Sequence, residues 1–501
     1  MLVTPSVQAE TATRLYTEHC ASCHGDDRLG GSGPALLPEN LQRLSLENAA
    51  TIIKDGSTAT QMPAFGQRLK TDEIESLVEY IYTPLLETPR WGLAEIEATH
   101  VIYNAPGALS AYPTYSADPL NLFLVVEAGD HHVTVLDGDR LEPIHRFKSR
   151  HALHGGLKYS PDGRFVYLAS RDGWASKFDL YNLELVAEVR AGINTRNLAV
   201  SSDGRFIIVG NYLPHSLVIL NADDLAPVKL ISVEDEHGNS SRVSAVYDAA
   251  PRRSFIAALK DLPELWEIPY HDEPTYYGRV HDYRDEGPPI ITESFPIRRI
   301  RLDDYVDDFF FDPDYQYLIG AARNANNGQV INLIVGRKIA DVDLPGLPHL
   351  GSGITWNYRG VPVLATPNLR EGSVTIIDMN TWTTVARIET LGPGFFMRSH
   401  ENTPYAWVDV FFGPHKDAVH VIDKSSLEIV KTLRPAPGKT SAHVEFTRDG
   451  RYALLSIWDN EGALVVYDAN TLDEVKRIPM NKPSGKYNVY NKIHRSTGTS
   501  H

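Results

Sequence analysis

One recurring phrase constrains the fold of this chain more than any other feature. Each copy contains a turn, two strands, a second turn and a further strand, and the clearest copies are 159–192, 200–233 and 446–480. Weaker copies begin near Tyr247, Phe311, Trp356 and His400, and a truncated copy starts at 122. The first period is 41 residues (203 − 162), which is the length of one four-stranded propeller blade. The eight copies predict an eight-bladed β-propeller, whereas an all-β sandwich would not explain the repeat.

Closure of the propeller is the next requirement, because unpaired first and last blades would keep bare edges. The segments THVIYN (99–104) and GKYNVYN (485–491) flank the repeats, and both are candidates for strands of one shared blade. Segment 270–300 is polar and rich in proline, so we interpret it as an insertion. A propeller surrounds a central channel, and we expect this channel to hold a ligand.

The N-terminal region carries a different signature. The run HCASCHG (19–25) contains the only two cysteines of the chain, Cys20 and Cys23, followed by His24. Cys-x-x-Cys-His is the attachment motif of c-type haem, in which both thiols form thioethers and the histidine ligates iron. A disulfide or half of a zinc site is the alternative, but no second Cys/His cluster completes a zinc site. We therefore predict one covalent c haem.

The residues around this motif predict a small all-helical cytochrome c domain. Met62 lies in a loop with proline and glycine, and Met/His ligation is typical of cytochromes c, so Met62 is the predicted sixth ligand. Helices are expected over 11–20, 45–56 and 71–85, the last with Thr71 as its N-cap. A doubly ligated haem leaves no open position for substrate, so this domain transfers single electrons.

The domain boundaries follow from these patterns. We predict the cytochrome c domain over 1–84, a linker with a candidate closing strand over 85–120, and the propeller over 121–501.

Composition and charge exclude several functions. The net charge of −16 argues against a nucleic-acid partner, because phosphate binding needs clustered Lys and Arg. No apolar run reaches the ~18 residues of a membrane span. The first ten residues lack the basic and apolar regions of a signal peptide. Since c haem is attached after export, we expect a mature or trimmed form of a periplasmic protein.

The architecture and several segments resemble the cytochrome cd1 nitrite reductase family, whose propeller binds haem d1. The resemblance covers essentially the whole chain and rests on 150–173, 191–206, 344–356, 456–468 and 484–491. It implies that His154 is the proximal ligand of the d1 iron and that His349 is a distal-side histidine. It also implies that Arg171 and Arg196 pair with carboxylates of the macrocycle.

Simpler structural explanations remain open for these residues. His154 and His349 fit ordinary loop histidines, and Arg171 fits a residue that ties a turn through Asp172. His443 fits a core histidine and Tyr487 a strand tyrosine in the closing blade. His400 and His415 receive no assignment.

The chain departs from the reductase pattern at the distal side. No histidine occurs from 282 to 348, so the position of the reductase's second active-site histidine is taken by Asp307 or a neighbour. A carboxylate there is ionised at pH 7 and repels nitrite. In contrast, His443 and Tyr487 supply a base and a phenol near the expected channel mouth.

These departures resemble the periplasmic dehydrogenases that complete haem d1 biosynthesis. That resemblance implies oxidation of a propionate of dihydro-haem d1 to an acrylate, with electrons leaving through the c haem. His443, Tyr487 and His349 would then be catalytic, and the protein a monomer in transient contact with cytochrome cd1 nitrite reductase. Nitrite reduction to nitric oxide and a haem d1 carrier are the alternatives. The sequence does not identify the electron acceptor.

Overall fold

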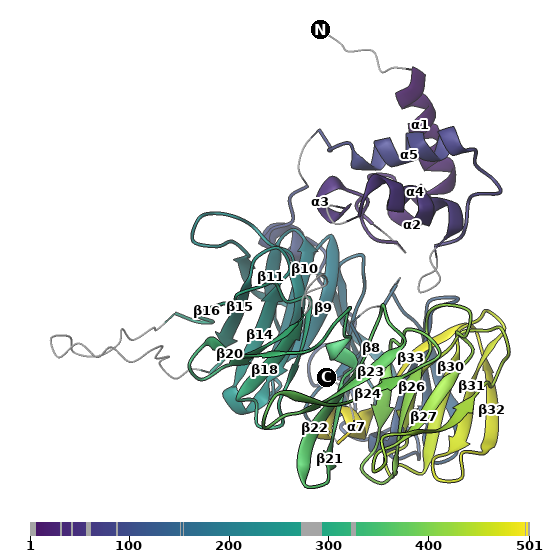
Figure 1. The fold of residues 1–501 in the computed structure, drawn as a ribbon. Helices are drawn as coiled ribbons and strands as arrows, with labels where there is room; N and C mark the ends of the chain where they lie inside the picture. Colours follow the sequence, from purple (N-terminus) through teal and green to yellow (C-terminus); the bar gives the residue numbers. More distant parts are fainter. Residues whose placement is uncertain are drawn as a thin grey trace.

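The computed structural model describes residues 7–30, 33–41, 44–56, 62–86, 89–150, 152–153, 155–271, 293–321, 327–495 and 497–498. Five helices lie in the N-terminal part: α1 (Val7–His19), α2 (Ala21–His24), α3 (Pro38–Leu41), α4 (Leu46–Asp55) and α5 (Thr71–Tyr82). They form a small bundle above the propeller in Figure 1. The prediction of a small helical domain is confirmed.

The bundle packs around one apolar cluster. The amphipathic helix α5 buries Ile74, Leu77, Val78 and Ile81 against α1 and α4. The prediction that Thr71 is the N-cap is wrong, because Thr71 is already the first helical residue. The cap is Lys70, whose backbone N–H donates to the Glu73 carboxylate at 2.8 Å.

Eight antiparallel sheets confirm the predicted eight-bladed propeller. Seven of them begin with the strand nearest the axis: β5 (Lys158–Tyr159), β9 (Asn194–Val200), β13 (Val243–Ala249), β17 (Asp308–Phe311), β21 (Ile354–Tyr358), β25 (Met397–Ser399) and β29 (Ser441–Phe446). In the eighth sheet this place belongs to β33 (Pro483–Asn488), the last strand of the chain. We call these eight the inner strands, because those of neighbouring blades contact one another around the propeller axis, for example β9 with β13 and β29 with β33.

The outer three strands of each blade follow in chain order. They are β2 (Leu122–Glu127), β3 (His132–Asp137), β4 (Glu142–Lys148); β6 (Phe165–Ala169), β7 (Trp174–Asp179), β8 (Glu184–Arg190); β10 (Phe206–Leu213), β11 (Ser216–Asn221), β12 (Pro227–Ser232); β14 (Ser254–Leu259), β15 (Glu264–Pro269), β16 (Arg298–Arg301); β18 (Tyr317–Ala321), β19 (Gly328–Asn332), β20 (Arg337–Val342); β22 (Val361–Pro367), β23 (Ser373–Asp378), β24 (Thr383–Glu389); β26 (Tyr405–Asp409), β27 (Val419–Asp423), β28 (Ile429–Leu433); and β30 (Tyr452–Ile457), β31 (Gly462–Asp468), β32 (Glu474–Met480).

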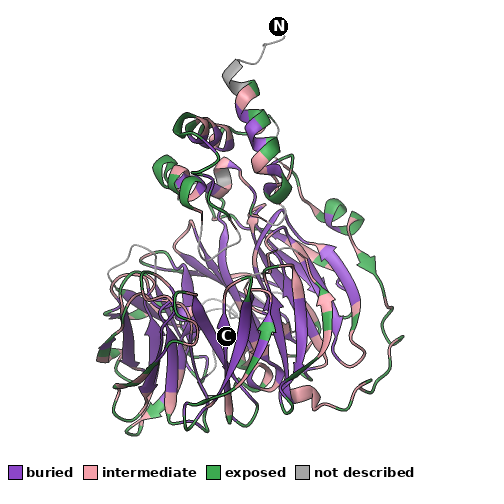
Figure 2. Cartoon of the chain, turned by 90° about the vertical axis from the view of Figure 1, so that its right-hand side faces the viewer, coloured by how far each residue is buried: buried purple, intermediate pink, exposed green. Residues whose placement is uncertain are grey.

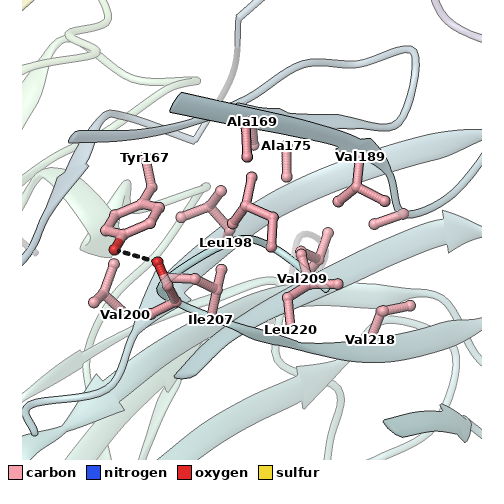
Figure 3. Close-up of a cluster of buried hydrophobic side chains, with 14 of the residues drawn as sticks. Tyr167, Ala169, Ala175, Val189, Leu198, Val200, Ile207, Val209, Val218 and Leu220 are labelled. Carbon is pink, nitrogen blue, oxygen red and sulfur yellow. Dashed lines mark hydrogen bonds between the residues drawn. The ribbon is translucent and has the colours of Figure 1, made fainter. Parts of the chain in front are cut away.

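Apolar side chains between neighbouring sheets hold the blades together. Figure 3 shows such a cluster between β6–β8 and β9–β11, where the Tyr167 hydroxyl donates to the Ala222 carbonyl at 2.9 Å. Buried residues fill the sheets and exposed ones gather in the turns (Figure 2). The core is therefore repeated blade by blade rather than concentrated at one place.

Closure uses only one of the two candidate segments. Strand β33 pairs with β2, with Leu124 opposite Tyr487, so the C-terminal segment completes the blade that the truncated first copy leaves open. The expectation that 99–104 shares this blade is wrong. Its strand β1 (Val101–Ile102) pairs with β8 on the outer edge of the neighbouring blade, where the Tyr103 hydroxyl donates to Glu188 at 3.1 Å.

The predicted insertion lies between adjacent strands of one blade. β15 pairs with β16, with Glu267 opposite Arg298, so the chain leaves this sheet and returns to it within 270–297. Most of the excursion, 272–292, falls outside the described residues.

The cytochrome domain packs directly on the propeller. Ala35 and Leu37 from the helical part form a buried cluster with Ile193 and Leu213 of the propeller, and Trp91 packs against it. The Trp91 indole N–H also donates to the Arg190 carbonyl at 2.9 Å. The predicted linker adds to this contact through helix α6 (Leu93–Ala98), whose Ile96 is fully buried in the cluster of Figure 3.

The last helix of the described residues contacts the inner part of several blades. Helix α7 (Val489–His494) follows β33 directly and contacts β2, β5 and β33. Beyond it, Arg495 donates to Asp248 at 2.8 Å and to the Tyr315 hydroxyl at 2.5 Å, in two further blades. Within the described residues, no helix is long and apolar enough to cross a membrane.

Candidate functional site

His24 has the arrangement expected of an iron ligand in a c-type cytochrome. It ends α2, and its Nδ1 donates to the Pro34 carbonyl at 2.7 Å, which leaves the lone pair on Nε2. Burial lowers the pKa of His24, so the ring is neutral, as metal ligation requires. A Cβ on Gly33 would lie 2.5 Å from His24 Cε1, so only glycine fits beside the ring.

The other predicted haem c residues surround the same helices. Cys20 is the N-cap of α2 and is half-buried, and Cys23 lies within this helix and is exposed. Cys20 and Met62 both pack on the apolar cluster of the helical domain. The described residues therefore fit a covalent haem, and the ligand set remains a prediction.

His349 repeats the arrangement of His24 in the propeller. It precedes the short helix η3 (Leu350–Ser352) before β21, and its Nδ1 donates to the Phe395 carbonyl at 2.5 Å. The lone pair is again on Nε2, which lies 3.9 Å from Asp308 Oδ2. Burial lowers the pKa of His349 despite the opposing effect of Asp308. His349 is therefore a neutral imidazole with its second nitrogen available to a metal.

The acidic residue beside His349 is Asp308 and not Asp307. Asp308 accepts hydrogen bonds from the Gly351 N–H at 2.6 Å and from the Tyr247 hydroxyl at 3.3 Å. Asp307 instead pairs with Lys260 at 3.1 Å, where both side chains are buried. Of the two candidates that the sequence left open, the neighbour faces the predicted distal histidine.

Arg171 and Arg196 belong to a larger basic cluster around Tyr212. The guanidinium of Arg171 lies 5.9 Å from the centre of the Tyr212 ring, that of Arg242 lies at 5.7 Å and the Lys260 ammonium at 5.6 Å. Burial by itself raises the pKa of Tyr212, but Arg196, Lys260, Arg171 and Arg242 together lower it to about 8. We call these five residues the Tyr212 cluster.

Arg196 is held in that cluster by its Nε, which donates to the Ser244 carbonyl at 2.8 Å on the next inner strand. Sequence reasoning missed Tyr212, Arg242 and Lys260. The available signal was their position at the ends of strands in consecutive blades, where basic side chains recur.

His443 and Tyr487, from neighbouring inner strands, lie together as predicted. Their ring centres are 5.2 Å apart in an edge-on contact, and Phe396 packs on the other side of His443 at 4.6 Å. His443 occupies a β-bulge with a positive φ of 57°, an unfavourable conformation for a residue with a side chain. Asp409 holds this bulge by accepting the His443 N–H at 3.1 Å.

The protonation of this pair is set by its surroundings. Burial, with Lys486, Arg398 and Lys492, lowers the pKa of His443 well below 6.5, so the ring is neutral. Burial raises the pKa of Tyr487 to about 12, so the phenol keeps its proton. Nδ1 of His443 accepts a long hydrogen bond of 3.4 Å from the Lys486 N–H. This contact must break if Nδ1 is to carry the proton of the neutral ring. Only then is Nε2 the nitrogen that can accept a proton.

His154 lies outside the described residues. The two glycines that follow it lie between the His443–Tyr487 pair and the Tyr212 cluster. A Cβ on Gly156 would lie 3.4 Å from the Tyr487 ring. A Cβ on Gly155 would lie 2.4 Å from the side chain of Asn197, the residue after Arg196. His400 is a fully buried blade residue that accepts the Asn402 N–H, and His415 contacts Arg434 at 3.5 Å.

Comparison with known proteins now defines the class. Residues 117–492 match the family described as cytochrome D1 heme domain, and residues 7–81 match the family described as cytochrome C oxidase, cbb3-type, subunit III. The chain belongs to the cytochrome d1 haem domain family, with a c-type cytochrome domain at its N-terminal side.

One relative is similar over nearly its full length. The dihydro-heme d1 dehydrogenase of Pseudomonas aeruginosa is 55% identical over 97% of this chain and 95% of its own length. A solved structure of dihydro-heme d1 dehydrogenase NirN in complex with DHE has a TM-score of 0.83 and 55% identity, and the match covers 96% of this chain and all of that one. The nitrite reductase of Stutzerimonas stutzeri is 25% identical over 97% of this chain and 93% of its own length.

Proposed function

We propose that this protein is a dehydrogenase that completes haem d1 biosynthesis by oxidising a propionate side chain of dihydro-haem d1 to an acrylate. The observation that carries the proposal is the 55% identity to a dihydro-heme d1 dehydrogenase over 97% of the chain. The site supports it, because the Asp308 carboxylate lies 3.9 Å from His349 Nε2. An ionised carboxylate in this place repels nitrite.

The reaction removes two protons and two electrons from a CH2–CH2 unit, and the proposed site provides for both. His443 accepts a proton, with Tyr487 orienting or relaying it, and the protons then pass to solvent. His154 and His349 hold the iron of the tetrapyrrole substrate, while Arg171 and Arg196 pair with its carboxylates. The two electrons leave singly for an external one-electron acceptor.

One covalent c haem, bound through Cys20, Cys23, His24 and Met62, supplies that one-electron chemistry. Because such haem is attached after export, we place the protein in the periplasm. We expect a monomer, and a dimer in size-exclusion chromatography would contradict this. Handing over the product implies a brief contact with cytochrome cd1 nitrite reductase, which transfer of haem d1 between the two purified proteins would test.

The decisive experiment supplies dihydro-haem d1 to the purified protein together with a one-electron acceptor. We expect a tetrapyrrole that is lighter by two hydrogens and, without the acceptor, reduction of the c haem. Tyr487→Phe keeps the ring contact with His443 and should slow turnover about 10²–10⁴-fold while binding persists. An unaltered tetrapyrrole with steady conversion of nitrite to nitric oxide would indicate a reductase, and binding alone a carrier.

A further inference from the structure

We propose that Asp409 is a positioning residue that holds the proposed iron ligand His349 and the proposed base His443 in fixed places relative to each other. It does so through hydrogen bonds to the backbone beside each histidine. This inference rests on the proposed function and deepens it, because it names the residue that sets the spacing between iron and base. In this role Asp409 acts through the two histidines and not on the reacting carbons.

The Asp409 carboxylate connects two separate parts of the chain. Asp409 is the last residue of β26 and is only 1% exposed. Its Oδ1 accepts the N–H groups of Phe395 and Phe396 at 2.7 and 3.1 Å, in the loop before β25. Its Oδ2 accepts the N–H of His443 at 3.1 Å, on the inner strand β29. One buried side chain thus holds both the loop and the strand.

The connection to His349 runs through a single peptide unit. The peptide between Phe395 and Phe396 donates its N–H to Asp409, and its carbonyl accepts the His349 Nδ1–H at 2.5 Å. Because a peptide unit is planar, its N–H and its carbonyl move together. Hydrogen bonds in a chain also polarise one another, so the carboxylate makes this carbonyl a stronger acceptor. A stronger acceptor behind Nδ1 raises the basicity of Nε2, the proposed ligand atom of His349.

The connection to His443 is direct. The pairing of β29 with β30 passes from Ala442 to Val444, so the N–H of the bulged residue His443 has no partner in this ladder. Asp409 accepts this N–H. A residue with a φ of 57° keeps that conformation only while its surroundings hold it. Loss of the acceptor would therefore release the backbone that carries the proposed base.

Ring contacts repeat the same connection. Phe395 packs on His349 with ring centres 4.3 Å apart, Phe396 packs on His443 at 4.6 Å, and the two phenylalanine rings are 4.5 Å apart. The loop also lies tightly against β26, because a Cβ on Gly394 would lie 2.8 Å from the Asp409 carbonyl. Adjacent loop residues thus contact one histidine each, and β26 fixes them both.

An asparagine could not replace this carboxylate. Burial raises the pKa of Asp409 to about 6, against the effects of the three N–H groups and of Lys486, so the side chain is largely ionised at pH 7. Arg398 is a second cation near enough to interact with it. An amide would lose the charge, and its NH2 group cannot accept an N–H. Asp409→Asn therefore keeps at most one of the two connections.

The test is a double-mutant cycle, in which haem d1 is titrated spectroscopically into the c-haem-loaded protein. Asp409→Asn should weaken haem d1 binding about 10- to 100-fold and alter the spectrum of the bound iron, as expected for a group behind a metal ligand. In the His349→Ala background the same substitution should have no further effect on affinity, because Asp409 acts through His349. Turnover at saturating dihydro-haem d1 should fall on the order of 10²-fold, because the base is displaced.

The matched control is Asp137→Asn. Asp137 is 4% exposed, ends strand β3 and accepts the backbone N–H groups of Asp139 and Arg140 at 2.8 and 3.2 Å. This variant should bind haem d1 and turn over like wild type. Gly394→Ala is a second test variant, because its Cβ pushes the loop away from β26 and leaves the Asp409 carboxylate in place. It decides the same cycle if Asp409→Asn does not fold.

Equal losses of affinity in the wild-type and His349→Ala backgrounds would overturn the positioning role, and so would wild-type binding and turnover in Asp409→Asn. The cycle measures binding and needs no turnover. Coupling to His349 in a protein that does not dehydrogenate its ligand would therefore sink the proposed reaction and leave the positioning role. Dehydrogenation without coupling would do the reverse. Absence of haem d1 binding by wild type would sink both.

Discussion

His24 and His349, the proposed iron ligands of the two domains, share one side-chain arrangement. Each is buried and neutral, and each donates Nδ1–H to a backbone carbonyl, that of Pro34 or Phe395. This contact fixes the tautomer and leaves Nε2 as the ligand atom. The two histidines lie in unrelated folds, and the shared arrangement is the one expected if both ligate iron, as we propose.

Met62 is predicted to be the sixth ligand of the c haem. Met62→Ala should retain covalent haem, because both thioethers and His24 remain, and should lower the midpoint potential, because Met/His ligation raises it. Redox titration of the purified protein measures this. Met379→Leu, a substitution of a buried propeller methionine, is the control and should leave the potential unchanged. A potential unaffected by Met62→Ala would remove this residue from the ligand set.

Tyr212 is predicted to make tetrapyrrole binding depend on pH. The basic cluster lowers its pKa to about 8, so the phenol is neutral below that pH and becomes a phenolate above it. The phenolate would neutralise Arg171 and Arg196 and repel the substrate's carboxylates, so affinity should fall as pH rises through about 8. Spectroscopic titration from pH 6.5 to 9 measures the effect, and Tyr212→Phe should abolish it. The same pH dependence in the variant would contradict the assignment.

The free energy of unfolding should respond to pH in the opposite direction to the affinity for the tetrapyrrole. Because the pKa of Tyr212 in the folded protein lies below the ordinary tyrosine value of about 10, ionisation favours the folded state, and this contribution is gained as pH rises above about 8. As pH rises above about 8, the affinity for the tetrapyrrole is thus predicted to fall while the free energy of unfolding rises.

Among the strands and helices, β33 and α7 both close the propeller and contribute to the proposed site. β33 completes the first blade by pairing with β2, and Arg495, directly after α7, then bonds Tyr315 and Asp248, which are 180 and 247 residues earlier in the chain. A propeller without this closure would expose the edge of β2 and lose the only strand that carries Tyr487. The strand that closes the propeller is therefore also the strand that supplies Tyr487 to the proposed site.

Arg495→Ala tests how firmly α7 is held. It would leave the buried Asp248 carboxylate with the Tyr270 hydroxyl at 2.6 Å but without its cation, which should lower the free energy of unfolding by about 1–3 kcal/mol. Chemical denaturation measures the change. Arg477→Ala, which breaks an exposed pair with Glu474, is the control and should cost at most about 0.5 kcal/mol. Equal effects of the two variants would show that α7 is not anchored by Arg495.

Across the chain as a whole, the cytochrome domain and the propeller are joined by a small apolar contact. Ala35 is adjacent to Pro34, whose carbonyl binds His24, and it packs on Leu213, which follows Tyr212. The loop that holds the haem ligand is thus in contact with a strand that ends in the proposed substrate site. We therefore expect electron transfer between the two domains to depend on this contact.

Leu37→Glu should loosen that contact by burying a charge between Ile193 and Leu213. We expect electron transfer from the substrate site to the c haem to slow at least about tenfold, a cost of about 1.4 kcal/mol in the barrier, while the spectrum of each site is unchanged. Stopped-flow reduction of the c haem measures it. Leu86→Glu, at a fully exposed leucine, is the control. An unchanged rate in Leu37→Glu would show that the interface does not limit transfer.

Much of this molecule follows from local sequence patterns. The 41-residue period predicted the blades, and Cys20, Cys23 and His24 predicted the haem domain, because alternation along strands and a covalent motif are both encoded within a few residues. The resemblance to known proteins added His349, His443 and Tyr487, and the structure brings the last two together.

Other features depend on contacts that no local pattern encodes. Whether Asp307 or Asp308 faces His349 depends on which way two adjacent side chains at the start of β17 point, and the sequence leaves both directions open. The Tyr212 cluster gathers side chains from three consecutive blades. These side chains meet because neighbouring blades pack side by side. The physical reason is that their contacts are made between blades, so they are set by the packing of the blades and not by the residues beside them in the chain.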